Sequence, residues 1–108
     1  MQHLGKAAQE AIDQNELRVS PAVVLELEYL HEIGRLGPGA RKIAGALAAE
    51  LGLRICDLPF PAIVDCALQE KWTRDPFDRL IVAHAKVQGA PLITKDEKIR
   101  RHYRRAIW

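Results

Sequence analysis

The sequence has few of the features that mark secreted, membrane-spanning or disulfide-rich proteins. Its 108 residues include only two cysteines and 6% aromatic residues. No apolar run approaches the roughly 20 residues that a membrane-spanning helix needs, and residues 1–10 are amphipathic and mixed in charge, unlike a secretory signal. The sequence also contains no low-complexity segment, internal repeat or long linker. We therefore expect one soluble, cytoplasmic domain over residues 1–108.

The two cysteines are not expected to carry chemistry. Cys56 and Cys66 lack a C-x-x-C spacing and lie among apolar residues. This arrangement is typical of buried thiols and argues against a disulfide or a zinc site.

Positive charge is concentrated near the carboxyl end. The net charge is only +2, but residues 95–105 contain only two carboxylates and a cluster of cations, Lys95, Lys98, Arg100, Arg101, Arg104 and Arg105. Such a patch attracts phosphate polymers in a salt-dependent way. The alternative is a solvated terminal helix.

Helical and strand patterns alternate along the chain. Periodicity and turn residues predict helices at 4–14, 21–34, 40–51, 76–88 and 95–102, and strands at 17–19, 53–56, 91–94 and 105–108. A further short helix, introduced by Pro59 and Pro61, is predicted to contain residues 63–68. Strands separated by helices imply a short parallel sheet covered on both faces, a three-layer α/β/α fold. Such a sheet is thinner than the roughly five or more strands that are usual.

Local signals predict several helix ends. Ser20 and Asp75 are each followed by proline, which is the pattern of a helix cap and a first helical residue. Gly52 and Gly89 follow the last residues of two helical patterns, where glycine commonly ends a helix.

Two carboxylates fall on apolar helix faces. On a wheel of 100° per residue, Glu26 lies in the apolar arc of its helix, whereas Glu28 and Glu32 fall on the solvent side as ordinary surface charges. Asp78 lies in the apolar arc of helix 76–88, and Arg79 lies on its solvent side. A carboxylate on an inner face costs several kcal/mol unless something compensates.

Structural roles compete with functional ones at these positions. Asp78 can complement the helix dipole and pair with the cap Asp75, and Ser20 can be a simple helix cap. Glu26 lies beyond the first turn without a nearby cation in its helix, so a structural role explains it less well. His84 is expected to be a packed helix residue rather than an acid or base.

A further carboxylate follows a predicted strand. Asp96 lies two residues after Thr94, and ligands in parallel α/β sheets bind beyond the carboxyl ends of the strands. Carboxylates that converge on one end of a sheet repel one another, and a divalent cation relieves that repulsion. Oxygen ligands suit Mg²⁺ or Mn²⁺ rather than zinc.

These residues resemble the PIN domain, specifically the VapC-type toxin ribonucleases of bacterial toxin–antitoxin pairs. The resemblance runs from about Leu4 to Trp108, and its most specific segments are 74–85 and 91–96. Segment 20–27 resembles the family's second acidic motif. The resemblance implies that Glu26, Asp78 and Asp96 are metal-site acids, with Asp75, Thr94 and Ser20 in supporting roles.

The resemblance also implies an activity and partners. The implied activity is that of a Mg²⁺- or Mn²⁺-dependent endoribonuclease. The implied partners are an RNA substrate, a VapB-like antitoxin and a second copy of the chain in a homodimer. The side chains expected to contact RNA are Arg79, Lys95, Arg100 and Arg101, although Arg79 could equally form a surface salt bridge.

The chain departs from the family pattern at its start. Family members begin with a central strand that ends in a Leu-Asp-Thr type motif, and its aspartate is the first metal ligand. The only aspartate before Ser20 is Asp13, near a helix end. We therefore expect a PIN-like domain that is incomplete at its amino end and lacks the first, central strand.

Two other functions remain open. A noncatalytic PIN-like module could bind the antitoxin as a decoy without cleaving RNA. A flavodoxin-like signalling domain also places carboxylates beyond parallel strands, and Lys95 would meet its demand for a lysine. It also needs a phosphorylatable aspartate at a central strand end, which this sequence does not provide.

Overall fold

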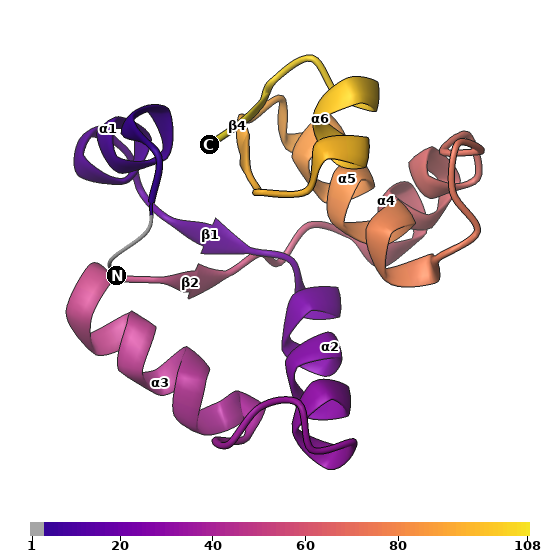
Figure 1. Cartoon of the computed structure of the whole chain (residues 1–108). Helices are drawn as coiled ribbons and strands as arrows, with labels where there is room; N and C mark the ends of the chain where they lie inside the picture. The colour runs from indigo at the N-terminus through magenta and orange to yellow at the C-terminus, as the bar shows by residue number, and fades with distance from the viewer. Residues whose placement is uncertain (1–3) are drawn as a thin grey trace. The chain divides into compact units, whose positions relative to one another are not determined.

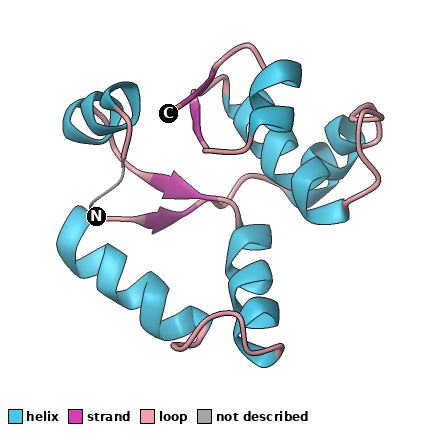
Figure 2. Ribbon diagram, viewed as in Figure 1, coloured by secondary structure: helices cyan, strands magenta, loops and turns pink. Residues whose placement is uncertain are grey.

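A computed structural model describes residues 4–108 (Figure 1). Its contacts divide the chain into two compact units, one formed by residues 16–57 and the other by residues 4–15 together with 58–108. Each unit combines helices with one pair of short parallel strands (Figure 2). The expectation of a single domain over residues 1–108 stays a prediction.

The unit 16–57 is a strand pair joined by two helices. Strands β1 (Arg18–Val19) and β2 (Arg54–Ile55) are parallel, with Arg18 opposite Arg54 and Val19 opposite Ile55. Parallel neighbours need a long crossover connection, which here consists of α2 (Pro21–Glu32) and α3 (Ala40–Leu51). The pairing therefore closes this unit around residues that are far apart in sequence.

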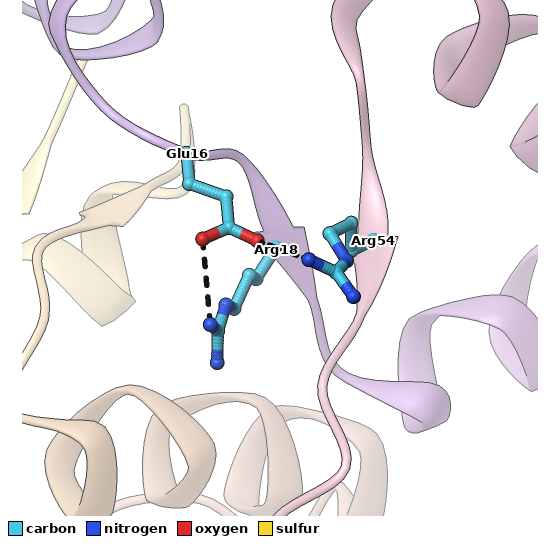
Figure 3. A network of polar contacts seen from close by, with 3 residues as sticks. All are labelled: Glu16, Arg18 and Arg54. Atoms are coloured by element: carbon cyan, nitrogen blue, oxygen red, sulfur yellow. Dashed lines mark hydrogen bonds and ion pairs between the residues drawn. The ribbon is translucent and has the colours of Figure 1, made fainter.

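One carboxylate offsets the charge repulsion that this strand register creates. Arg18 and Arg54 lie directly opposite each other, and like charges in that position destabilise a strand pair. Figure 3 shows Glu16 between them, with its two oxygens 3.4 Å from Arg18 Nη2 and 3.3 Å from Arg54 Nη1. Because all three side chains are exposed, each pair contributes little individually.

Both helices of this unit begin at capped positions. Ser20 Oγ accepts a hydrogen bond from the Ala22 backbone N–H at 3.1 Å, which confirms the predicted cap of α2. Helix α3 begins after a glycine that has no capping side chain, and its Ala40 N–H donates instead to Glu28 Oε1 at 3.1 Å. The expectation that Glu28 is an ordinary surface charge is therefore wrong. Glu28 is half-buried because it satisfies the orphan donor of the neighbouring helix.

The other unit is built around a long central helix. Its elements are α1 (Lys6–Gln14), α4 (Phe60–Ala67), α5 (Pro76–Gln88), β3 (Leu92–Ile93), α6 (Glu97–His102) and β4 (Ala106–Ile107). Strands β3 and β4 are parallel, with Leu92 opposite Ala106 and Ile93 opposite Ile107. The Ala8 N–H donates to the Trp108 carbonyl at 3.2 Å and so ties α1 to the carboxyl end of the chain.

A glycine is required at Gly5, where the start of α1 lies against the backbone of Trp108. A Cβ atom on Gly5 would lie 2.4 Å from the carbonyl carbon of Trp108, closer than any side chain can approach. Glycine therefore allows the close backbone contact at the start of α1.

Two apolar clusters pack against α5. One contains Val82 and Ala85 with Ile99 and Tyr103, and the half-buried Trp72, Leu92 and Ala106 pack against it. The other contains Ala83 with Ile63 and Ala67 of α4. Val82, Ala83 and Ile63 are fully buried. Helix α5 is thus the element to which α4 and α6 are both attached.

The α/β class with short parallel strands is confirmed, and the helix and strand order is as predicted. The strands form two separate two-stranded sheets in residues 4–108 rather than one continuous sheet. Within that part of the chain, the first strand is β1, and it follows a helix. Every helix in residues 4–108 is too short or too polar to span a membrane.

Cys56 and Cys66 are not joined in a disulfide. Cys56 is buried as expected, whereas Cys66 is only half-buried. Burial is also the main factor that raises the pKa of the Cys66 thiol, followed by the negative charge of Glu70.

Two valines of α5 provide a matched test of this core. Val82→Ala should lower the free energy of unfolding by about 2 kcal/mol, because it removes two buried carbons and leaves a cavity. Val87→Ala, on the same helix with a side chain 41% exposed, should change it by less than about 0.5 kcal/mol. Chemical denaturation of both variants measures the difference, and equal effects would contradict the assigned core.

Candidate active site

Two helices of the unit that contains α5 begin with the same local motif. Thr73 Oγ1 accepts the Asp75 N–H at 3.2 Å, and Thr94 Oγ1 accepts the Asp96 N–H at 3.1 Å. Asp75 then caps α5 and Asp96 caps α6 through their side chains. A Thr-x-Asp sequence therefore sets the position of a carboxylate at the start of each helix.

The capping hydrogen bonds involve one oxygen of each carboxylate. Asp75 Oδ1 accepts from the Phe77 N–H at 2.8 Å and the Asp78 N–H at 3.4 Å. Asp96 Oδ1 accepts from the backbone N–H groups of Lys98 and Ile99 at 2.8 and 3.1 Å. The orientation of each side chain is thus fixed by its own helix.

Asp78 lies in the first turn of α5, close enough to both caps to be influenced by their charge. Partial burial raises the pKa of the Asp78 carboxyl most, and the negative charges of Asp75 and Asp96 raise it further. Lys98 opposes this increase. The negative charges of Asp75 and Asp96 therefore disfavour the ionised form of Asp78. The expected convergence of Glu26, Asp78 and Asp96 on one site stays a prediction.

The chemistry of this donor set fits Mg²⁺ or Mn²⁺, which prefer oxygen ligands. The geometry is less complete, because no three His, Cys, Asp or Glu side chains among residues 4–108 are grouped closely enough to hold one ion. The assignment of Asp78 and Asp96 as cation ligands of this unit, with Asp75 beside them, stays a prediction.

Glu26 belongs to the other unit, on α2. It is half-buried, and α2 contains no fully buried residue. Ser20, which begins that helix, is 7% exposed. The assignment of Glu26 to the same site as Asp78 and Asp96 stays a prediction.

The basic residues expected to contact RNA differ in their surroundings. Arg79 is half-buried, and its Nε–H donates to the Thr73 carbonyl at 2.8 Å, so it supports the turn that precedes Asp75. This contact corrects the expectation that Arg79 lies on the solvent side of α5. Lys95, Arg100 and Arg101 are exposed, and a hollow of about 280 Å³ is lined by Glu97, Arg100 and Arg101.

Comparison with known proteins identifies the family to which this chain belongs. The PIN domain model matches residues 2–105. The chain belongs to the PIN domain family. It is 33% identical over 103 residues to Ribonuclease VapC22 of Mycobacterium tuberculosis (strain ATCC 25618 / H37Rv), a match that covers 94% of this chain and 79% of that relative. No solved structure gave a significant match.

Several residues that support this PIN domain were missed in the sequence. Glu70 is 2% exposed, and its oxygens accept from Lys86 Nζ at 2.8 Å and from Trp72 Nε1 at 2.9 Å. Thr73 is also buried. The repeated Thr-x-Asp sequence could have revealed Thr73, but no local pattern marks Glu70, whose partner Lys86 is distant along the chain.

His84 of the PIN domain is packed as predicted. It is 6% exposed, and its Nδ1 lies 3.1 Å from the Leu80 carbonyl one turn earlier in α5. The His84 side chain is therefore buried and bonded to its own helix.

The raised pKa of Asp78 predicts a pH-dependent penalty on folding. A carboxyl with a higher pKa in the folded chain binds its proton more tightly there, so stability falls as pH rises from the ordinary aspartate value through the folded value. Asp78→Asn should therefore raise Tm at pH 7, and the gain should shrink toward pH 4.

Thermal unfolding at several pH values, without divalent cations, measures this effect. Asp65→Asn is the control, because Asp65 is an exposed aspartate of α4. A Tm difference between wild type and Asp78→Asn that stays constant from pH 7 to pH 4 would contradict the prediction.

Proposed function

We propose that this protein is a VapC-type toxin that hydrolyses RNA with Mg²⁺ or Mn²⁺. The observation that carries the proposal is the PIN domain match, which contains the acids Asp75, Asp78 and Asp96 at the starts of α5 and α6. Neighbouring carboxylates disfavour one another's charged forms, and a bound cation relieves that cost. Membership of the PIN family and the similarity to a VapC ribonuclease support nuclease chemistry at this cluster.

Each acidic residue has a distinct task in this proposal. Asp78 and Asp96 hold the cation, and Asp75 adds negative charge beside it. Glu26 is assigned to the metal-site acids from its sequence motif alone. Thr73 and Thr94 keep the two capping carboxylates in place through the backbone N–H groups of Asp75 and Asp96. A bound Mg²⁺ or Mn²⁺ ion would make a water molecule more acidic and stabilise the leaving oxygen.

The basic carboxyl end supports an anionic polymer as the substrate. Among the residues that the structure describes, the cations of segment 95–105 form no ion pair with a carboxylate. Unpaired, exposed cations raise the local concentration of phosphate groups. Lys95, Arg100 and Arg101 would contact RNA phosphates in this proposal. Arg79 would instead support the turn before Asp75 through its hydrogen bond to the Thr73 carbonyl.

The proposal includes a VapB-like antitoxin, a homodimer and a cytoplasmic location. An exposed apolar row along α2 and its C-cap residue Ile33 supports a protein partner, because Leu25, Tyr29 and Ile33 are 63%, 51% and 49% exposed. These residues are four positions apart, so they line one side of the helix. Exposed apolar rows of this kind are typical of interaction surfaces.

The same row favours the second candidate function, a noncatalytic decoy. A module that only binds an antitoxin would keep this apolar surface and would not need a complete metal site. The ungrouped acids of residues 4–108 are compatible with that alternative.

Substitution of one acid distinguishes the two functions. Asp78→Asn should reduce Mn²⁺-dependent cleavage of RNA at least about 100-fold, since changes merely next to a metal ligand already cost 10- to 100-fold. Asp65→Asn should leave cleavage unchanged. Gel analysis of a labelled RNA, with and without EDTA, measures both.

The outcomes separate clearly. Cleavage that persists in Asp78→Asn would contradict the site assignment. Tight antitoxin binding by a wild-type protein that never cleaves RNA would favour the decoy.

The basic patch predicts salt-dependent RNA binding. Arg100→Gln combined with Arg101→Gln should weaken binding and reduce the slope of log affinity against log salt by about 0.7 for each RNA phosphate that the protein no longer neutralises. Arg41→Gln, an exposed arginine of α3, is the control. Fluorescence anisotropy at several salt concentrations gives the slopes, and an unchanged slope would remove this surface from the proposed interface.

A further inference from the structure

Trp72 and His102 form a stacked aromatic pair beside the candidate active site. Their ring centroids are 4.9 Å apart and the ring planes differ by 8°. Trp72 is half-buried and packs against the cluster of Val82, Ala85, Ile99 and Tyr103. His102, the last residue of α6, is exposed. The Trp72 ring is thus packed against the core, whereas the His102 ring is exposed to solvent.

Both rings are held by hydrogen bonds at their edges. Trp72 Nε1–H donates to Glu70 Oε1 at 2.9 Å, and the buried Glu70 is fixed in turn by Lys86 Nζ at 2.8 Å. His102 Nδ1–H donates to the Lys98 carbonyl at 2.9 Å. These hydrogen bonds orient both rings before any ligand binds, which lowers the entropy cost of stacking a further ring on the pair.

The surroundings of the pair are positively charged. Lys98 Nζ lies 5.9 Å from the centre of the Trp72 ring, one helical turn before His102. On a wheel of 100° per residue, Arg101 lies next to the row formed by Lys98 and His102. Arg101 also lines the hollow on α6 with Arg100 and Glu97. An aromatic surface flanked by cations suits a flat, uncharged ring that is linked to phosphates.

We propose that the exposed face of His102, supported by Trp72, stacks an unpaired nucleobase of the RNA substrate. This inference rests on the proposed function and adds a subsite to it. Single-stranded RNA is commonly bound by stacking its bases on aromatic side chains while basic residues contact its backbone. The subsite lies at the opposite end of α6 from Asp96, about 9 Å along a helix of six residues, so the stacked base belongs to a nucleotide near the cleaved bond.

Binding of an intact and an abasic strand tests this subsite. The Asp78→Asn protein is used in Mg²⁺ to prevent cleavage, with a single-stranded RNA and an abasic oligonucleotide of the same length. Adding His102→Ala should weaken binding of the intact strand roughly 5- to 150-fold and leave binding of the abasic strand unchanged. His102→Tyr, which keeps a flat ring, should restore the affinity.

His31→Ala is the matched control. His31 is an exposed histidine of α2 whose Nδ1 also lies near a backbone carbonyl, that of Leu36 at 3.3 Å. Its removal should affect neither strand. Thermal unfolding of each variant shows whether the fold is retained.

A second measurement does not depend on changing His102. Trp72 and Trp108 are the two tryptophans of the chain, so Trp108→Phe makes Trp72 the sole tryptophan. The intact strand should quench its fluorescence more than the abasic strand does.

Each outcome decides the inference. Equal quenching by both strands, or an equal loss of affinity for both in His102→Ala, would overturn the stacking subsite while RNA binding itself stands. A protein that binds neither strand would overturn the proposed ribonuclease function, and the subsite with it.

Discussion

The burial of α5 is the constraint around which residues 58–108 are organised. Val82 and Ala83 are adjacent in sequence and fully buried, yet they belong to different apolar clusters. One side of the helix therefore receives α4, and the other receives α6 with the strand pair β3 and β4. Because interiors are closely packed, the starts of α5 and α6 cannot shift independently, and these starts carry Asp75, Asp78 and Asp96.

Two carboxylates of the candidate site, Asp75 and Asp96, also cap helices. Asp75 and Asp96 each satisfy two backbone N–H groups at a helix start, and Thr73 and Thr94 fix them from the other side. Capping stabilises the charged form of a carboxylate, whereas the proximity of the three acids destabilises it. Partial burial, followed by the charges of Asp75 and Asp96, raises the pKa of the Asp78 carboxyl. A cation or a lysine opposes that increase, and Lys98 does so in part.

Much of the fold was predictable because its determinants are local. Ser20, Asp75 and Gly89 lie at the predicted helix ends, since capping and left-handed glycine conformations depend on only a few neighbouring residues. The motifs that contain Asp78 and Asp96 are local for the same reason, and the role of these acids in a metal site stays a prediction. The role of Glu28 was not predictable, because its partner Ala40 belongs to the next helix and a helical wheel describes only one helix at a time.

The order of the elements, the helix ends and the acidic motifs follow from the sequence alone, because each is specified within a few residues along the chain. Tertiary structure decided which side chains meet. It placed Glu70 against Lys86, Trp72 against His102, and the charge of Asp96 near Asp78. These contacts join residues from different elements, and their existence depends on how helices pack in three dimensions, which neither periodicity nor spacing specifies.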